Sequence, residues 1–191
     1  SFITQVFDVM GACSHVTFQI LTKRPARAAA WPGPWTPNVW MGTSVENRSV
    51  LHRLDALRGC RAQIKFISFE PLLEALGPLN LQGYHWAIVG GESGPGYRPM
   101  DHAWARAIRD QCRTANVAFF FKQSAAFHTE RGTLLEEADG TRQQIREYPD
   151  HAPITPLPAL HSTVASTKTR IAKSLSPVQI ALLESGEEDH V

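Results

Sequence analysis

Five short apolar runs recur along the chain at intervals of about 20 to 30 residues, the length of one β-strand, one crossover helix and two loops. Each run is rich in β-branched or aromatic residues. In most of them apolar residues occupy both alternating positions, as in strands that are covered on both faces. The repeat predicts alternating β and α units and therefore a parallel sheet. The five runs are Val16–Thr22, Asn38–Ser44, Ile64–Glu70, His85–Gly91 and Val117–Gln123.

Two of the stretches between these runs, Glu46–Arg58 and Asp101–Thr114, have the apolar spacing of amphipathic helices. We therefore predict an α/β fold, namely a partial parallel β/α barrel of the TIM-like type with about five β/α units. Five units are fewer than the eight of a complete barrel, and the chain opens at Ser1 within a helical pattern. We interpret it as the C-terminal part of a longer barrel. A doubly wound open sheet is the alternative.

The pattern of the chain changes after the fifth run. Asp139-Gly140 predicts the turn of a small polar hairpin, and a stretch rich in Pro, Ser and Thr follows without periodicity, as in a linker. Ser176 as N-cap and Pro177 as the first helical residue then predict a short helix before an acidic end. The predicted segments are the partial barrel at 1–127, the hairpin extension at 128–148, the linker at 149–175, and the helix with the acidic end at 176–191.

The net charge, the apolar runs and the cysteines argue against several classes of protein. A net charge of +1 gives no general attraction for a polyanion, so nucleic-acid binding is not indicated. No apolar run reaches the roughly 18 residues of a membrane span, and the chain does not open like a signal peptide. Cys13, Cys60 and Cys112 are too far apart for a disulfide framework or a local metal site, and they predict reduced thiols. We therefore expect a cytoplasmic protein.

Polar residues follow the strands in a repeated form. The second, third and fourth runs each lead into a small residue, any residue and then a glutamate, and these glutamates are Glu46, Glu70 and Glu92. Since side chains alternate with a period of two, the small residue and the glutamate share one face of the strand. Ligands of barrels and of open α/β sheets bind at the carboxyl ends of the strands. The candidate ligand-binding residues at these ends are Lys23, Arg24, Ser44, Glu46, Ser68, Glu70, Gly90, Gly91, Glu92, Ser93, Arg98, Lys122 and Gln123.

This set of charges fits more than one kind of site. Carboxylates in the middle with cations on both sides suit a ligand that carries an amine and a carboxylate. As an alternative, Glu46, Glu70 and Glu92 bind Mg²⁺ or Mn²⁺ beside an anionic substrate. The charges could instead pair with one another, as Glu70 with Lys122, and close the end of the barrel. Glu46 could equally be a first-turn residue that the helix dipole favours.

The most specific local feature is the loop Gly90–Gly96, which has four glycines in seven residues. Such a loop can turn sharply and direct backbone N–H groups at a ligand, or it can be a tight connection without a ligand. It has the form neither of a P-loop nor of a dinucleotide-binding loop. Arg98 follows in the same loop, and we expect it either to bind a carboxylate or phosphate or to pair with Asp101.

Five segments of the chain together resemble one known protein family. They are Ile20–Pro25, Val39–Glu46, Phe66–Leu73, Trp86–Gly94 and Phe119–Gln123. The family that they resemble is an uncharacterised phage and prophage family, named after gene products thirty-seven and sixty-eight of its founding phages. The resemblance covers residues 1–148 and keeps the segments in the same order.

The resemblance implies a radical-SAM-like barrel that holds a [4Fe–4S] cluster and S-adenosylmethionine (SAM) and acts by radical chemistry. Members of that family carry clustered cysteines in an N-terminal segment, and this chain has no such segment. Cluster ligands need to lie together on one short loop, so we expect Cys13, Cys60 and Cys112 to bind no cluster. No catalytic residue is carried over from the family to this chain.

Three functions follow from the sequence as alternatives. The first is the C-terminal part of a radical-SAM-like enzyme, in which the strand ends bind SAM and a small polar or nucleobase-type substrate. By itself such a part is expected to be inactive. The second is a β/α-barrel enzyme that depends on a divalent metal. The third is a non-catalytic accessory protein or the remnant of a phage protein.

Overall fold

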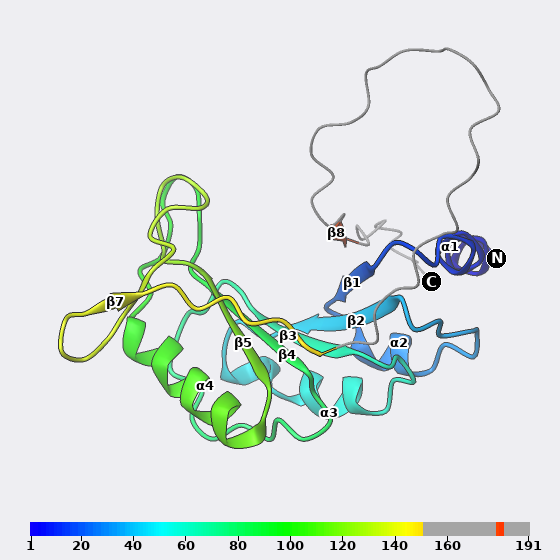
Figure 1. Cartoon of the computed structure of the whole chain (residues 1–191), viewed down its shortest axis with the longest axis horizontal. Coiled ribbons are helices and arrows are strands. Elements are labelled where there is room, and N and C mark those ends of the chain that lie inside the picture. Colours follow the sequence, from blue (N-terminus) through cyan, green and yellow to red (C-terminus); the bar gives the residue numbers. More distant parts are fainter. Residues whose placement is uncertain (151–178, 182–191) are drawn as a thin grey trace, which may run out of the picture.

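The computed structural model describes residues 1–150 and 179–181 (Figure 1). A parallel sheet lies at its centre, and all five strands that the sequence predicts are present within two residues of their expected bounds. The strands are β1 (Phe18–Thr22), β2 (Val39–Ser44), β3 (Lys65–Phe69), β4 (Trp86–Gly90) and β5 (Ala118–Gln123).

Helices precede and connect these strands, except between β3 and β4, where residues 70–85 form an irregular connection. The longest helix, α4, begins where Asp101 accepts a hydrogen bond from the backbone N–H of Ala103, and it ends at Asn116 in the left-handed conformation. Both are common helix signals, because they satisfy backbone groups that the helix itself leaves free. The helices are α1 (Phe2–Ala12), α2 (Pro25–Ala29), the 3₁₀-helix η1 (Arg48–Val50), α3 (His52–Arg58) and α4 (His102–Ala115).

The order of the strands distinguishes between the two predicted architectures. Neighbours in the sheet follow the order β5-β4-β3-β2-β1, and every pair is parallel. A doubly wound sheet reverses its order at one point and carries helices on both faces. From β1 to β5 the order shows no reversal, and α2, α3 and α4 lie on one face (Figure 1), while β8 (Gln179–Ala181) pairs with the other edge of β1. This arrangement is compatible with a partial β/α fold, but no pairing among the described strands closes the sheet into a barrel.

The face that carries α2, α3 and α4, called the helix face below, holds the main core. Strand side chains that point to it pack against Leu54 and Leu57 of α3 and against Ile108 and Cys112 of α4. Burying each large apolar side chain of this kind stabilises the fold by roughly 1.5–3 kcal/mol. The strand residues in this core are Ile20, Val39, Met41, Ile67, Phe69, Ala87, Val89, Phe119 and Phe121, none more than 5% exposed.

The opposite face of the sheet carries a second cluster, which is largely aromatic. Trp86 is at its centre, with ring centroids 6.0 Å from Trp40, 5.9 Å from Phe66 and 5.9 Å from Phe120. These rings come from four adjacent strands and meet near edge-on or tilted, which are favourable geometries for aromatic pairs. The cluster fills the amino-terminal half of the opposite face.

A short hairpin follows the sheet. β6 (Leu135–Glu136) and β7 (Arg142–Gln143) pair antiparallel, and Gly140 between them has a φ of 83°. The chain then returns along the edge of the sheet: the backbone N–H of Phe121 donates to the carbonyl of Ile145 at 2.9 Å. This segment covers the free edge of β5, which would otherwise offer unpaired backbone groups.

The C-terminal predictions fall mostly outside the described residues. Nearly all of the predicted linker at 149–175 lies there. Of the predicted helix at 176–191, only β8 (Gln179–Ala181) is described, and it is a strand that pairs parallel with β1. The predicted helix is wrong at these residues, because the edge of β1 presents backbone groups that a strand can satisfy and a helix cannot. No helix in the described residues is long and apolar enough to cross a membrane.

Candidate functional site

Part of the predicted polar set lies at the carboxyl end of the opposite face. Register pairing places Ser44 beside Ser68, and Ser68 beside Ile88 of β4. All three side chains point to the face that carries the aromatic cluster, because their positions alternate with those of the core residues. Two residues further along β2 and β3, the same face carries Glu46 and Glu70. We call the charged residues at this level, Lys23, Glu46, Arg53, Glu70 and Lys122, the charged row.

Glu46 lies between two cations. Arg53 Nη1 donates to Glu46 Oε2 and to the carbonyl of Ser44, at 3.0 Å each. Lys23 Nζ lies 3.0 Å from Glu46 Oε1, in an orientation that makes an ion pair but no hydrogen bond. The Glu46 side chain is only 11% exposed, and its Oε1 is buried without a hydrogen-bond donor among the described residues. This carboxylate therefore keeps one oxygen that can accept a hydrogen bond from a ligand.

Glu70 and Lys122 pair across the strand that separates them. Lys122 Nζ of β5 donates to Glu70 Oε1, beyond the end of β3, at 2.7 Å. The two meet above Gly90 of β4, where a Cβ would lie 3.0 Å from Glu70 Oε1. A residue with a side chain at position 90 would therefore push Glu70 away from Lys122. The pairing of Glu70 with Lys122, one of the alternatives from the sequence, is what the structure shows.

Glu92 does not join the charged row. The glycine-rich loop carries it away from the sheet, and Arg98 binds it through Nε to Oε2 at 2.9 Å and through Nη2 to Oε1 at 2.6 Å. These hydrogen bonds lower the pKa of Glu92 to about 2. Arg98 therefore pairs with Glu92 rather than with Asp101, which caps α4 instead.

Three other predicted residues hold the loops together. A Cβ at Gly91 would lie 2.2 Å from the backbone N of Ala125, so only glycine permits this close approach. Ser93, in the loop after β4, forms a bridge with Ala126 in the loop after β5. Gln123 is buried on the helix face, where its Nε2 donates to the carbonyl of Gly91 at 3.2 Å. These contacts give the three residues a structural role in place of the expected contact with a ligand.

The two serines and Arg24 complete the predicted set. Ser44 and Ser68 are 5% and 3% exposed, and neither hydroxyl forms a side-chain hydrogen bond within the described part of the chain. Both hydroxyls can therefore serve a ligand above the aromatic cluster. Arg24 is exposed next to Lys23, and its backbone N–H donates to Thr22 Oγ1 at 3.0 Å.

The charged row has more positive than negative groups. Lys23, Arg53 and Lys122 are three cations, and Glu46 and Glu70 are two carboxylates, so the row carries one excess positive charge. An anionic group such as a carboxylate is attracted by this excess. The free oxygen of Glu46 favours a donor such as an ammonium or a hydroxyl group.

Sequence reasoning missed Arg53 and the aromatic cluster. The same alternation that connects Ser44 with Glu46 leads backwards to Trp40, and the one that connects Ser68 with Glu70 leads back to Phe66, so the pattern contained the signal for the cluster. Arg53 gave no such signal, because it comes from α3 and reaches the strand end from the side.

The structure does not gather the three predicted glutamates into a metal site. Glu46, Glu70 and Glu92 each pair with a different cation. Over residues 1–150, no group of three or more metal-binding side chains is placed to hold an ion. This geometry does not favour the metal-dependent alternative.

The cysteines lie on three different elements. Cys13 follows α1, Cys60 follows α3, and Cys112 is part of α4, and all three are free thiols. Burial raises the pKa of Cys112 to about 12 and also raises that of Cys60. Both thiols therefore stay protonated at neutral pH, whereas a metal ligand is a thiolate. The three residues do not fit a cluster-binding loop.

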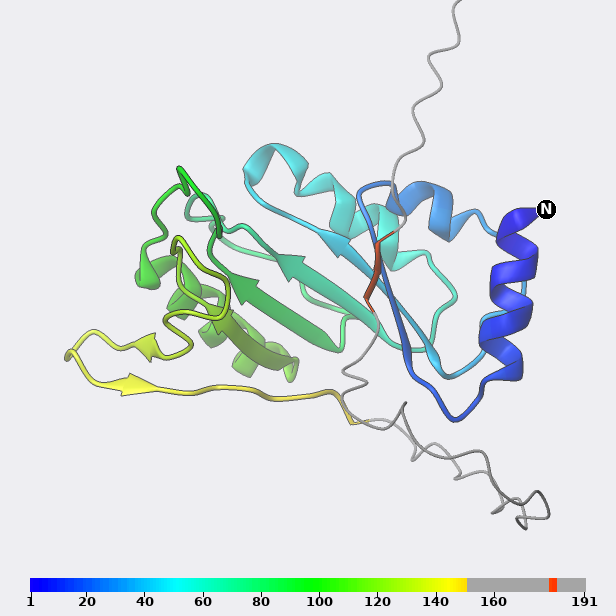
Figure 2. The ribbon, with the colours of Figure 1, turned by 90° about the horizontal axis from the view of Figure 1, so that it is seen from above.

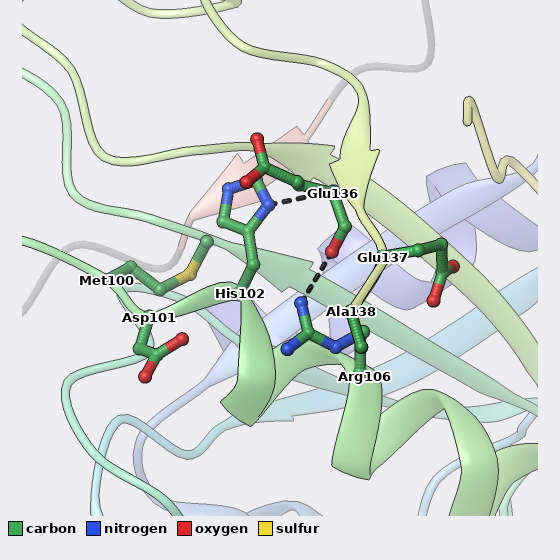
Figure 3. A pocket seen from close by; sticks show the side chains of 7 residues that line it. All are labelled: Met100, Asp101, His102, Arg106, Glu136, Glu137 and Ala138. Atoms are coloured by element: carbon green, nitrogen blue, oxygen red, sulfur yellow. Dashed lines mark hydrogen bonds between the residues drawn. The ribbon is translucent and has the colours of Figure 1, made fainter. Parts of the chain in front are cut away.

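Two cavities lie away from the charged row. One of about 470 Å³ is lined by Tyr84, His85 and Cys112 near the amino ends of β4 and β5. The other, of about 400 Å³, lies between the start of α4 and the β6–β7 hairpin and includes His102 and Glu136 (Figure 3). Neither cavity is lined by any of the predicted ligand-binding residues.

One family model matches residues 1–175, and its description is "Protein of unknown function (DUF5131)". No curated protein and no solved structure matches the chain significantly. The match supports the prediction that the chain belongs to an uncharacterised family. It leaves the phage origin and the relation to radical-SAM proteins as predictions.

Proposed function

Because the chain belongs to the family described as Protein of unknown function (DUF5131), we propose its function from its own geometry: the charged row binds a small molecule that carries both an ammonium and a carboxylate group. The resemblance in sequence suggests SAM, whose methionine part has both groups. On this proposal the chain is the C-terminal part of a radical-SAM-like protein of phage type.

The buried, unbonded oxygen of Glu46 is the observation that carries the proposal. The Lys23 ammonium lies 3.0 Å from this oxygen as an ion pair without hydrogen-bond geometry, and a ligand ammonium would supply the missing hydrogen bond. Lys23 lies beside the same oxygen, and its side chain is 59% exposed, so its ammonium is free to turn towards a ligand carboxylate. The ammonium and the carboxylate of one ligand can thus pair with Glu46 and with Lys23, which lie next to each other.

The fold agrees with this assignment. The charged row lies at the carboxyl ends of parallel strands, which is where barrel proteins bind their ligands. On the proposal, Glu46 and Lys23 hold the ammonium and carboxylate of SAM, and Ser44 and Ser68 contact polar groups deeper on the face. A bound cluster would supply the electron for radical chemistry, but the cysteines of this chain do not fit it, so we derive no chemical step from them.

The substrate and the compartment remain predictions from the sequence. A small polar molecule or a nucleobase-type compound is the expected substrate, and the cytoplasm is the expected location.

Calorimetric titration of the chain with SAM tests the binding proposal. Glu46→Gln removes the charge that holds the ammonium, and we expect affinity to fall roughly tenfold or more, because hydrogen bonds to charged groups contribute about 1.5–3 kcal/mol. Glu92→Gln is the matched control, since it removes a strand-end glutamate outside the charged row. We expect it to change affinity less than about twofold.

Three results would contradict parts of the proposal separately. Absence of heat with SAM, or equal affinity in the wild type and Glu46→Gln, rejects the binding site. Heat with Mg²⁺ or Mn²⁺ that disappears in Glu70→Gln supports the metal alternative instead. A cluster-loaded, full-length relative that does not cleave SAM rejects the radical chemistry while the binding site stands.

A further inference from the structure

We propose that His102 is a proton-sensitive latch that holds the β6–β7 hairpin and the loop after β5 against α4. His102 is the first residue of α4 and lines the cavity of about 400 Å³ together with Arg106 and Glu136 (Figure 3). Its ring lies tilted against that of Phe121 of β5, with the centroids 5.3 Å apart. The imidazole therefore lies where α4, β5 and β6 meet.

Both ring nitrogens of His102 are engaged. Nδ1 lies 2.9 Å from the backbone N of Glu136, and because a backbone N–H can only donate, Nδ1 carries no proton. The proton of the neutral ring is then on Nε2, which donates to the hydroxyl of Ser124 at 2.7 Å. That hydroxyl donates in turn to the carbonyl of Gly132 at 3.0 Å. The bond that Nδ1 accepts from Glu136 requires a neutral imidazole, whereas Nε2–H can donate to Ser124 in either protonation state.

α4 holds the backbone of Glu136 at two points (Figure 3). Arg106 Nη1 donates to its carbonyl at 2.5 Å, and His102 accepts from its N–H. A protonated imidazole is a donor at both nitrogens, so the N–H of Glu136 would then face a second donor and lose its acceptor. Since the Arg106 contact does not depend on this proton, we expect β6 to loosen while the fold persists.

The charged groups around His102 come from α4, β6 and β7. Burial is the largest influence and lowers the pKa of His102 below its usual value. Arg106 and Arg142 lower this pKa further, whereas Glu136 and Asp101 raise it. The neutral ring that the bond from Glu136 requires is thus also the form that the surroundings favour. The bond from the N–H of Glu136 to Nδ1 is complete above the ordinary pKa of about 6.5 and is lost as the pH falls through the lower pKa of the folded protein.

The latch is connected to the loops at the carboxyl end of the sheet. Ser124 and Gly132 belong to the loop that follows β5. Ala126 of this loop is bonded to the loop that follows β4: its N–H donates to the carbonyl of Glu92 at 3.0 Å, and its carbonyl accepts from the N–H of Gly94 at 3.2 Å. Because a protonated ring still donates from Nε2 to Ser124, we expect protonation to release β6 first, while the loop after β5 and the contacts of the charged row remain. The inference holds whether or not SAM is the ligand.

Nuclear magnetic resonance of the full chain tests the latch. At about pH 7.5, long-range ¹H–¹⁵N spectra report the tautomer of each histidine, and we expect the Nε2–H form for His102. Hydrogen exchange, corrected for its intrinsic pH dependence, then follows the amide of Glu136 down to about pH 5. We expect its protection to fall roughly five- to tenfold, as for the loss of one hydrogen bond.

Two variants distinguish the effect of protonating His102 from other effects of low pH on the protein. His102→Gln offers a neutral amide in place of the ring, and we expect protection at Glu136 to become independent of pH. His128→Gln removes an exposed histidine outside these hydrogen bonds, and we expect it to keep the wild-type response. The amide of Lys65, which donates to His85 Nδ1, reports the other buried histidine separately.

An Nδ1–H tautomer at His102 would overturn the inference. So would protection at the Glu136 amide that stays constant across this pH range in the wild type. Both measurements use the wild-type chain, so they decide the question even where His102→Gln does not fold.

Discussion

The two faces of the sheet differ in the kind of side chain that they carry, although the same strands form both. On the helix face, β5 presents Phe119 and Phe121, which are fully buried in the main core. On the opposite face, β2 presents Trp40, then Ser44 and then Glu46, so its side chains change from aromatic to small to charged along the strand. Figure 2 shows the sheet from above, with the carboxyl ends of β2, β3 and β4 lying side by side.

The helix face of the sheet serves packing, whereas the opposite face also carries groups that can bind a ligand. The helix face is mostly apolar, and its buried polar residues Thr43 and Gln123 hydrogen-bond to the backbone. The opposite face is apolar at one end, where the rings fill it, and polar at the other, where Glu46 Oε1 lacks a hydrogen bond among the described residues. An unsatisfied polar group close to an apolar core costs stability, and such a cost is typical of functional sites.

Adjacent phenylalanines on β5 provide the strongest test of the comparison. Phe119→Ala empties a fully buried position on the helix face, and we expect it to lower the free energy of unfolding by about 3–5 kcal/mol. Phe120→Ala acts on the opposite face, where the ring is partly exposed and contacts Trp86, Tyr148 and Arg146. We expect about 1–2 kcal/mol there, because a partly buried ring loses less. Urea denaturation of both variants measures the difference.

The two substitutions share the strand, the residue type and the change in volume, so each is the control for the other. Equal losses would mean that the opposite face is packed as tightly as the helix face. In that case the distinction between a packing face and a binding face would have to be abandoned.

Gly90 and Gly91 at the end of β4 allow a second comparison, between a contact with the charged row and a contact with a neighbouring loop. An alanine at Gly91 would meet the backbone of Ala125 at 2.2 Å, whereas an alanine at Gly90 meets only the flexible side chain of Glu70. We expect Gly91→Ala to cost about 1–3 kcal/mol, as overpacking does. Gly90→Ala should cost less than about 1 kcal/mol, since a partly exposed ion pair contributes little.

The second effect of Gly90→Ala is specific to the charged row. Displacing Glu70 frees the ammonium of Lys122, and we expect the reactivity of Lys122 towards an amine-labelling reagent to rise, as measured by mass spectrometry. Gly59→Ala is a suitable control, because a Cβ there lies 4.0 Å from its nearest neighbours. Unchanged labelling of Lys122 would show that the ion pair does not depend on the glycine.

The sequence predicted the five parallel strands well, and the structure places Glu46 and Glu70 of the predicted set next to the ends of β2 and β3. Both successes come from strict alternation, which is a local property of an extended chain. The same rule failed for Glu92, because the loop after β4 packs on the loop after β5, where Ser93 bridges Ala126, and Arg98 of its own loop binds the Glu92 carboxylate.

Some contacts between distant segments were beyond the reach of the sequence pattern. Arg53 reaches Glu46 from α3. Such a pair depends on how elements pack in three dimensions, and no spacing along the chain encodes it, whereas the pair of Glu70 with Lys122 was one of the alternatives from the sequence. The strand at Gln179–Ala181 was missed for the same reason, since its pairing partner is the edge of β1.

The smallest expected effect concerns Glu92, which continues the alternation in sequence but lies in a loop. Its hydrogen bonds from Arg98 lower its pKa to about 2. Because the pKa is lower in the folded than in the unfolded chain, any stabilisation is complete above about pH 4.5 and is lost as the pH falls towards 2. Carbon-detected titration of the Glu92 carboxyl group measures this directly.

Arg98→Gln should return the titration of Glu92 to the ordinary range of a glutamate near 4.3. Arg142→Gln, which removes the partner of Glu136 in the distant hairpin, should leave the titration of Glu92 unchanged. Because Glu92 is exposed, neither change is expected to alter the unfolding midpoint at neutral pH measurably. A Glu92 that titrates in the ordinary range in the wild type would mean that Arg98 is free in solution. Arg98 could then turn towards the charged row, and the charges of the loop after β4 could no longer be treated as separate from those of the charged row.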